Sequence, residues 1–385
     1  MNPTRLRLLT LVGILGLAYL IFRPRNRGDV VHSLLVSTPS NTSFPFHILT
    51  LPDLVPTPLP RTSAVQGTFF PSHIATVNRK RREFLVTNER KDGEVWAVKL
   101  SSGIDLVDSV RSGGDEPAHC TTSRSGLHLI CANYGSPSVS VSTINPLRHV
   151  YTFTIPKHGK SISHPHQIVQ HPVLDDVYYV PDLGMNVILV LKLEGSNENP
   201  RFSALQRQEI SENSAVGARH LAVTPDGKTL FLGAQTSSNV LPFSLHQDGR
   251  INSIYHTASL SSLPLHLEAS ETFALSDVQL HTQELFVLNR RVRPPYIGAG
   301  DTMAIIDVSD PDSLSVTQYV ELGCWQTREM FHWSDVAGPS LAVTCQGADG
   351  NGAGVVLLRK VAGGWAVVNS WDSGRAGAMG IAGLS

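Results

Sequence analysis

The sequence has almost no net charge and lacks the short motifs that identify nucleotide enzymes and serine hydrolases. Its 31 basic and 32 acidic residues leave a formal charge of -1, so no global field would attract a polyanion. It contains no phosphate-binding glycine loop, no Gly-x-Ser-x-Gly elbow and no dinucleotide fingerprint. We therefore expect no nucleic-acid partner, and neither hydride transfer nor nucleotide chemistry.

Cysteine is scarce, and the four residues present fall into two pairs. Cys120 and Cys131 flank a turn at residues 123–126, and Cys324 and Cys345 lie around residues 334–338 in a similar arrangement. Two disulfides in an oxidising compartment are one interpretation. The other is that all four are small buried hydrophobic side chains. The sequence leaves both open.

Long amphipathic helices are absent after residue 30, whereas 31 Gly and 24 Pro are spread along the chain. Many short strands separated by tight turns require this distribution. The composition therefore indicates an all-β protein.

The first thirty residues differ from the rest. Arg5 and Arg7 precede an apolar run from Leu8 to Phe22, and Arg23, Arg25 and Arg27 follow it. The run would cover about 22 Å as a helix, which is short for a bilayer span and within the length of a signal segment. We assign residues 1–30 to a membrane anchor helix or signal segment and favour an uncleaved anchor, because the flanking Arg/Pro cluster offers no good cleavage site. We thus expect a membrane-associated protein of the endoplasmic reticulum or secretory pathway, with its orientation open because both flanks are basic.

Residues 31–385 contain an internal repeat, whose starts recur about every 46 to 57 residues. Each unit has an apolar strand, a turn such as Pro225-Asp226-Gly227-Lys228, a second strand ending in a polar residue, and two further strand-like segments. Six units are visible, and strands near Leu34 and Phe46 can complete a seventh with the C-terminus. The stretch from Pro52 to Pro60 is expected to connect this unit to the next. The repeat predicts a seven-bladed β-propeller whose closed ring leaves no open sheet edge.

Residues at the same phase of the repeat should surround one central channel, because the inner strands of all blades line it. The first predicted ring holds His73, His119, His166 and His220, with Asp277 and Phe331 at degenerate positions. The second holds Glu89, Asn133, Asp182, Gln235, Asn289 and Gln346. Arg219, Arg290 and Arg328 lie beside these positions, and buried arginines require an anionic partner such as a carboxylate, a phosphate or a developing oxyanion.

Two other interpretations of the rings stay open. A histidine at a fixed blade position can serve structure by bonding a neighbouring blade, and the polar strand ends can cap turns. Glu89, Asn133, Asp182 and Asn289 also carry oxygen atoms of the kind that Ca²⁺ prefers. We expect neither a metal nor an organic cofactor.

Seven motifs resemble, in order, those of the 6-phosphogluconolactonase-like propellers, a family that includes the fungal carboxy-cis,cis-muconate cyclase. They are Pro117-Ala-His119-Cys, Ala132-Asn-Tyr-Gly135, His164-Pro-His166-Gln, Asp182-Leu-Gly184, Gly217-Ala-Arg-His220, Pro225-Asp-Gly227 and Asn289-Arg290. The resemblance implies catalytic roles for His164 or His166, Arg219, position 235 and Arg290. The chain departs from the family at position 235, where Gln235 stands in place of Glu and cannot exchange a proton at neutral pH.

This departure favours ring formation over hydrolysis. We expect a cyclase, isomerase or pericyclase of the hetero-Diels–Alder type, acting on a small oxygenated substrate in fungal secondary metabolism. A lactone hydrolase of the 6-phosphogluconolactonase type and a non-catalytic binding propeller are the alternatives. The expected catalytic residues are His164, His166, Arg219, Gln235 and Arg290. The expected substrate-binding residues are His73, Glu89, His119, Asn133, Tyr134, Asp182, His220, Asp277 and Arg328. The expected partners are a small-molecule substrate and, through the N-terminal segment, the membrane; we expect no nucleic acid, and the protein should be a monomer.

Overall fold

A computed structural model describes residues 31–384 except 39–45, 59–69, 80, 160, 211–215, 255–258, 268–272, 297, 336–337, 349–351 and 375–376. The expected anchor lies in residues 1–30, outside the described residues. Within the described ranges, no helix is long and apolar enough to cross a membrane.

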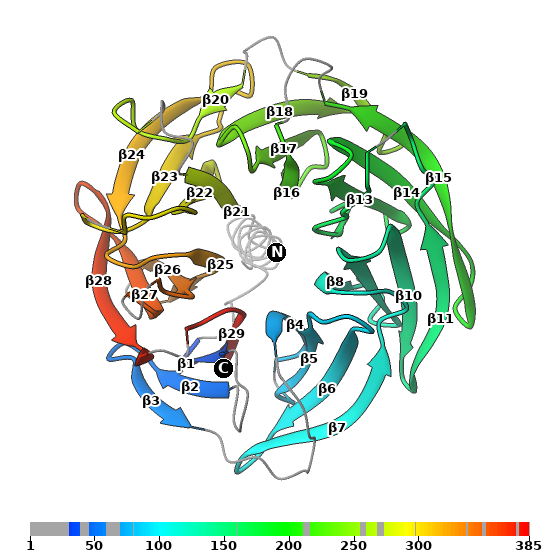
Figure 1. The fold of residues 1–385 in the computed structure, drawn as a ribbon, viewed down its shortest axis with the longest axis horizontal. Helices are drawn as coiled ribbons and strands as arrows, with labels where there is room; N and C mark the ends of the chain where they lie inside the picture. Colours follow the sequence, from blue (N-terminus) through cyan, green and yellow to red (C-terminus); the bar gives the residue numbers. More distant parts are fainter. Residues whose placement is uncertain are drawn as a thin grey trace, which may run out of the picture.

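The described strands form seven antiparallel sheets arranged as the blades of a closed ring (Figure 1). We number the blades from the first complete one in the sequence. Blade 1 contains β4 (Pro71–Asn78), β5 (Glu83–Asn88), β6 (Glu94–Leu100) and β7 (Ile104–Arg111). Blade 2 contains β8 (Pro117–Thr122), β9 (His128–Asn133), β10 (Ser138–Ile144) and β11 (Leu147–Thr154). Blade 3 contains β12 (Val169–Gln170), β13 (Val177–Asp182), β14 (Val187–Ser196) and β15 (Asn199–Glu209).

The remaining blades follow the same order from the axis outward. Blade 4 contains β16 (Ala218–Val223), β17 (Thr229–Ala234), β18 (Asn239–Leu245), β19 (Ile251–Ile254) and a short β20 (Leu260–Ser261) that pairs with β18. Blade 5 contains β21 (Phe273–His281), β22 (Glu284–Arg291), β23 (Thr302–Asp307) and β24 (Ser315–Glu321). Blade 6 contains β25 (Thr327–Asp335), β26 (Gly338–Cys345), β27 (Gly354–Val361) and β28 (Gly364–Asp372).

Blade 7 joins the two ends of the chain, as the sequence predicted. Its inner strand is β29 (Ile381–Leu384), followed outward by β1 (Ser33–Ser37), β2 (Phe46–Thr50) and β3 (Val55–Pro58). The expectation that the Pro-rich stretch is only a connection was wrong for its middle part. Pro56 and Pro58 belong to β3, an outer edge strand, where a missing backbone N–H breaks no necessary ladder bond.

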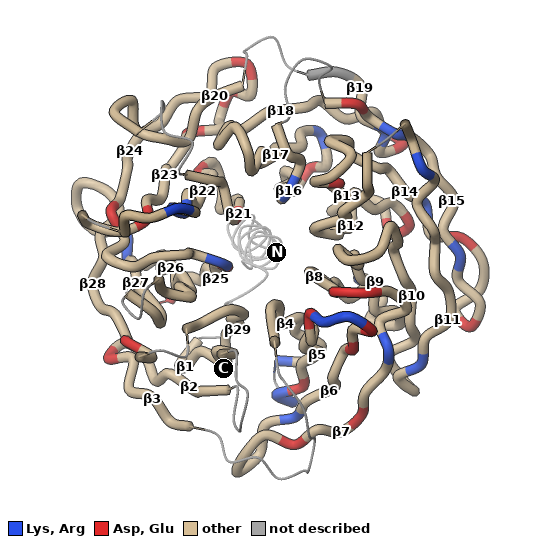
Figure 2. The backbone as a smooth tube through the Cα atoms, in the orientation of Figure 1, with Lys and Arg blue, Asp and Glu red and all other residues tan. Residues whose placement is uncertain are grey.

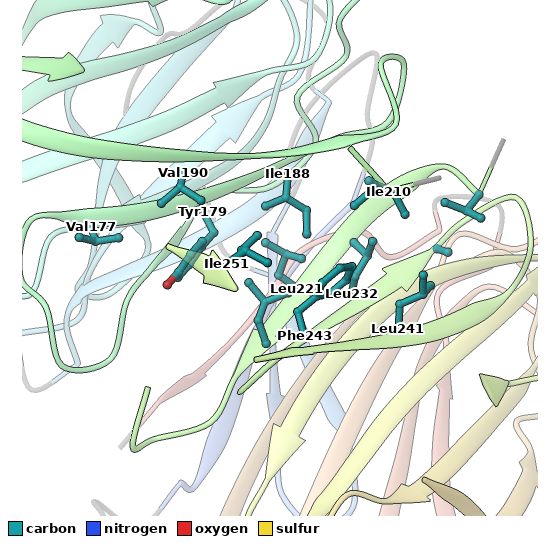
Figure 3. Close-up of a cluster of buried hydrophobic side chains, with 14 residues drawn as sticks. Val177, Tyr179, Ile188, Val190, Ile210, Leu221, Leu232, Leu241, Phe243 and Ile251 are labelled. Carbon is teal, nitrogen blue, oxygen red and sulfur yellow. The ribbon is translucent and has the colours of Figure 1, made fainter. Parts of the chain in front are cut away.

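The hydrophobic core lies between blades. Seven clusters of buried side chains occupy the seven interfaces between neighbouring blades. In the cluster between blades 3 and 4, Tyr179, Ile188 and Leu232 pack together with residues of both sheets (Figure 3). Because the central strands are covered on both faces, they are continuous apolar runs instead of alternating ones; every residue of β17 is buried. Replacing a fully buried core side chain such as Phe231 by Ala should cost about 3–5 kcal/mol.

The turns follow the sequence signals closely. Gly227 of the Pro225-Asp226-Gly227-Lys228 turn has φ of +71°, a left-handed conformation that glycine adopts without strain. Both cysteine pairs are disulfides, Cys120–Cys131 across the β8–β9 hairpin and Cys324–Cys345 between the loop before β25 and the end of β26. The disulfide interpretation is therefore the one that the structure adopts.

Candidate functional site

A bulge near the start of the inner strand turns functional side chains toward the axis. The β4–β5, β8–β9, β16–β17, β21–β22 and β25–β26 registers all shift at this point. Bulges commonly re-aim side chains next to active sites. In blade 4 the shift lies between Ala218 and His220, so Arg219 and His220 both line the central cavity.

The cavity has a volume of about 320 Å³ and collects residues from all seven blades. It opens where the inner strands begin and the second strands end, and we call this end of the ring the site face. Most of the predicted residues line it: His73, Glu89, His119, Tyr134, His166, Arg219, His220, Gln235, Asp277, Arg290 and Arg328. Arg- and Lys-containing segments occur on β16, β22 and β25, whose inner ends surround the axis (Figure 2).

Three predicted site residues do not line the cavity. Asn133 donates to the hydroxyls of Ser138 and Ser140, and Asp182 accepts hydrogen bonds from Ser163 and from the backbone N–H of His164 and Met185. His164 stacks behind Tyr134, with ring centroids 4.6 Å apart, and its Nδ1 lies 2.9 Å from the Tyr134 carbonyl oxygen. The structure therefore places these three side chains behind the cavity lining, where they hold neighbouring turns and loops.

The second predicted ring mixed two phases of the repeat. The strand registers align Asn133, Asp182 and Asn289 with Asn88, whose side chain accepts a hydrogen bond from the Phe70 backbone. The residues that face the cavity come one position later: Glu89, Tyr134, Leu183, Gln235 and Arg290. Side chains alternate along a strand, so an error of one residue exchanges the cavity for the blade interior.

The most important residue missed in the sequence is Glu329. Phe331 was predicted at this phase, but it packs on Trp333 with ring centroids 5.8 Å apart. The bulge between Thr327 and Met330 places Arg328 and Glu329 in the cavity. The neighbouring pair Arg219-His220 was the available signal, since Arg328-Glu329 repeats its pattern of an arginine followed by a titratable residue. Gln167 and Gln279 also line the cavity and were missed.

Two histidine–carboxylate pairs, each formed between different blades, lie at the cavity wall. His220 Nδ1 is 2.7 Å from Asp277 Oδ1, and the carboxylate also accepts from the backbone N–H of Val278 and Met330. Because an ionised carboxylate only accepts, His220 carries its proton on Nδ1 and its Nε2 is free to act as a base. Burial lowers the pKa of His220 against the raising effect of Asp277, so the ring is neutral at pH 7.

In the second pair the pKa of the histidine is raised instead of lowered. His73 Nδ1 lies 2.6 Å from Glu329 Oε1, and Glu329 Oε2 accepts from the Ile381 backbone N–H. Burial lowers the pKa of His73, but the charge and hydrogen bond of Glu329 outweigh it and the net pKa is raised. Burial raises the pKa of Glu329 in turn.

His119 and His166 are neutral histidines of the same cavity. His119 stacks on His73 with ring centroids 4.0 Å apart, and His166 lies 5.2 Å from His220. Burial, followed by the neighbouring histidines and, for His166, by Arg219 and Arg290, holds the pKa of both rings well below the usual range. The Nδ1 atoms of both rings are buried and have no hydrogen-bond partner among the described residues.

Three arginines give the cavity its charge, of which Arg219 is buried and Arg290 and Arg328 are half-buried. Arg219 donates to the Ser276 carbonyl and to Gln235 Oε1, and Arg328 donates to Gln346 Oε1. The side chains of Gln235 and Gln346 are neutral amides, so they orient the guanidinium groups without cancelling their positive charge. Arg290 Nε has no partner among the described atoms. Burial and the other arginines lower the pKa of Arg290 well below its usual range and that of Arg219 to about 10. A bound anion would relieve this repulsion.

Glu89 is the carboxylate that faces the arginines directly. Burial raises its pKa, against the opposing effects of the Ser72 hydroxyl and of Arg328 and Arg219. It does not meet Asn133, Asp182 or Asn289, whose side chains are engaged in the blades. The calcium interpretation therefore loses its ligand set, and the described residues contain no group of three or more His, Cys, Asp or Glu side chains that could hold a metal ion.

The fold and the site define a lactonase-type propeller. Residues 51–350 match the family model described as Lactonase, 7-bladed beta-propeller, and the chain belongs to this family. A 6-phosphogluconolactonase of Formosa agariphila is 26% identical over 165 residues. That match covers 40% of this chain and 46% of the relative, so the chain spans about half the length of the curated relative it matches.

Solved structures share the fold over nearly the whole chain. A protein from Lactobacillus plantarum has a TM-score of 0.74 at 19% identity and covers 92% of this chain and 100% of its own. A putative 6-phosphogluconolactonase from Bacteroides fragilis has a TM-score of 0.72 at 17% identity, with coverage of 94% and 100%. The periplasmic gluconolactonase of Pseudomonas aeruginosa has a TM-score of 0.70 at 19% identity, with coverage of 92% and 99%. At these identities the likeness shows the fold alone.

Proposed function

We propose that the protein hydrolyses a lactone whose carbon skeleton carries an anionic group, either a carboxylate or a phosphate. The observation that carries the proposal is the His220–Asp277 pair, which faces the same cavity as Arg219, Arg290 and Arg328. The pair supplies a base and the arginines supply a site for negative charge. The name of the Formosa relative makes 6-phosphogluconolactone the first substrate to test.

The proposed reaction uses these residues in two steps. His220 Nε2 takes a proton from a water molecule, whose oxygen attacks the lactone carbonyl, and Asp277 stabilises the imidazolium that forms. The carbonyl oxygen gains negative charge, which Arg219 stabilises by a charge-assisted hydrogen bond. The ring C–O bond then breaks, the leaving oxygen takes the proton back from His220, and the product is a hydroxy acid. Arg290 and Arg328 hold the anionic group of the substrate.

The sequence argued against hydrolysis because Gln235 cannot act as a base, and the proposed mechanism takes its base from another position. Position 235 cannot take a proton, but the adjoining pair at 220 and 277 can. The expected ring-forming or hetero-Diels–Alder activity is not supported by the relatives, which favour the lactone hydrolase alternative. Ring closure of an unsaturated polycarboxylate remains the second candidate function, because Gln235 is the one specific observation in its favour.

The test compares hydrolysis of 6-phosphogluconolactone and gluconolactone by wild type, His220→Gln and Asp277→Asn. We expect the phosphorylated lactone to have the higher kcat/KM and each variant to lose about 10²- to 10⁴-fold, the usual contribution of a general base. His246→Gln, an exposed histidine on an outer turn, is the matched control and should retain wild-type rates. If the protein turns over neither lactone but catalyses ring closure of an unsaturated polycarboxylate, the hydrolase proposal is wrong and the second candidate function replaces it.

A further inference from the structure

Three carboxylates belong to the described lining of the central cavity, and Glu89 differs from the other two. Asp277 lies 2.7 Å from His220, and Glu329 lies 2.6 Å from His73. Each of these two carboxylates also accepts hydrogen bonds from backbone N–H groups. Glu89, which directly follows β5, faces the cavity arginines instead of a histidine. The proposed mechanism gives it no role.

Glu89 is a counter-charge to all three cavity arginines. Burial lowers the pKa of Arg219, Arg290 and Arg328, and the negative charge of Glu89 opposes this effect at each of them. The side-chain acceptors of Arg219 and Arg328 within the described site are neutral amides. An anion that enters the cavity therefore competes with Glu89 for the same positive charges.

Burial favours the protonated form of Glu89, whereas the arginines favour the ionised form. Loss of solvation raises the pKa of the carboxyl group, and neither the Ser72 hydroxyl nor the charges of Arg328 and Arg219 cancel this effect. The neighbouring Glu116 raises the pKa of Glu89 further. Any decrease in the positive charge that faces Glu89 should therefore drive proton uptake.

An anion bound in this cavity must lie close to Glu89. The cavity volume is about 320 Å³, and a sphere of this volume is about 8 Å across, which is within the range of charge interactions at physiological salt. A dianion held by the arginines would offset much of their charge and add negative charge beside Glu89. At this separation it should raise the proton affinity of the carboxylate by about tenfold or more.

We propose that Glu89 and the three arginines form a proton-coupled site for a dianion of the phosphate-monoester type, which binds together with one proton taken up by the Glu89 carboxyl group. The protonated group has an O–H that can donate to the anion, whereas the carboxylate only accepts and would repel it. The site should therefore bind the dianion more tightly as the pH falls. The inference rests on the proposed function for the phosphate ester, but the proton uptake does not depend on which bond the cavity breaks.

Histidines of the same cavity also respond to an anion. His73, His119, His166 and His220 line it, and negative charge nearby favours the protonated form of each ring. A variant that removes only the titration of Glu89 is required to separate its proton from theirs.

The experiment measures binding of sulfate to the full-length protein by isothermal titration calorimetry, between about pH 5 and about pH 9. Sulfate is a tetrahedral dianion throughout this range, so it neither gains nor loses a proton itself. Titrations in two buffers of different ionisation enthalpy give the number of protons taken up on binding. For the wild type we expect proton uptake and a Kd that rises with pH, by up to about tenfold per pH unit.

Glu89→Gln replaces the carboxylate by a neutral group of nearly the same shape. We expect this variant to bind sulfate about tenfold or more tightly than the wild type at the alkaline end of the range, and to take up fewer protons. Glu116→Gln is the matched control, because Glu116 lies near Glu89 but does not line the cavity. It should keep the proton uptake of the wild type. Circular dichroism establishes that each variant is folded.

Equal proton uptake by the wild type and Glu89→Gln would overturn the proposal, because the proton would then go to a histidine. Weaker sulfate binding by Glu89→Gln would overturn it too, because the carboxylate would then assist the anion. Lactone turnover without sulfate binding would contradict this inference and leave the hydrolase function standing. Proton uptake on sulfate binding that depends on Glu89, in a protein without lactone turnover, would support the inference and contradict that function.

Discussion

At the scale of single residues, neutral side chains orient the positively charged arginines of the site and leave their charge available to a substrate. Gln235 and Gln346 each accept a hydrogen bond from a cavity arginine, Arg219 and Arg328 respectively. A carboxylate in either place would hold the same geometry but remove one positive charge. The substitution of Gln at position 235 thus has an electrostatic consequence as well as a catalytic one.

Gln235→Glu should weaken binding of an anionic lactone. The new carboxylate would pair with Arg219, and a charged group in a desolvated site is worth more than the same group in water. We expect KM for 6-phosphogluconolactone to rise at least tenfold and KM for uncharged gluconolactone to change little, measured by initial rates. Gln247→Glu, on an outer turn, is the control. An equal change in KM for both substrates would mean that the net charge of the cavity does not contribute to binding of the anionic lactone.

The pH dependence of kcat/KM should report His220. As a base it acts when neutral, so the rate should fall as pH drops through its pKa. Burial places that pKa below the usual value of about 6.5, and activity should persist below this pH. Asp277 raises the pKa of His220, so Asp277→Asn should lower the rate and move the acid limb to still lower pH. A limb that stays in place would exclude this pair as the base.

At the scale of strands and loops, the bulges at the inner strands decide which residues meet the substrate. The repeat identified the positions near each bulge, and eleven of the predicted residues line the cavity. It failed at the β25 bulge, where Phe331 was predicted in place of Glu329, and it was out by one position at Asn133 and Asp182, which end second strands. A bulge adds a residue without changing the apolar pattern of the strand, so sequence periodicity cannot locate it.

The disulfide Cys324–Cys345 should stabilise the loop that leads into β25 and hence Arg328. It closes a loop with a sequence separation of 21 residues. Chain-entropy arguments give a loss of about 3 kcal/mol in the free energy of unfolding for Cys324→Ser/Cys345→Ser, measured by urea denaturation. Cys120→Ser/Cys131→Ser, with a separation of 11, should cost slightly less. The opposite order would show that local strain outweighs chain entropy here.

At the scale of the whole molecule, blade 7 closes the ring by pairing β29 with β1, segments from the two ends of the chain. The closure also reaches the site, because the Ile381 N–H donates to Glu329. Removing the closure would expose β1 as an edge and leave the apolar residues between blades 6, 7 and 1 partly uncovered.

Deletion of residues 378–385 should therefore abolish the cooperative fold. We expect aggregation in size-exclusion chromatography and loss of a single thermal transition. A chain that starts at residue 31 is the control; it keeps every described strand and should remain soluble and folded. A soluble, cooperative protein after the C-terminal deletion would show that six blades suffice for the ring.

The sequence by itself determined the class of fold, the number of blades, the joining of the two ends and most of the residues around the axis. Each of these follows from periodic burial and turn chemistry, which act locally and repeat in every blade. Only the tertiary structure decided which polar strand ends face the cavity, and that Glu329 pairs with His73 and Asp277 with His220. These depend on bulges and on contacts between different blades, and a one-residue shift in a strand reverses the direction of a side chain without altering the composition that the sequence displays.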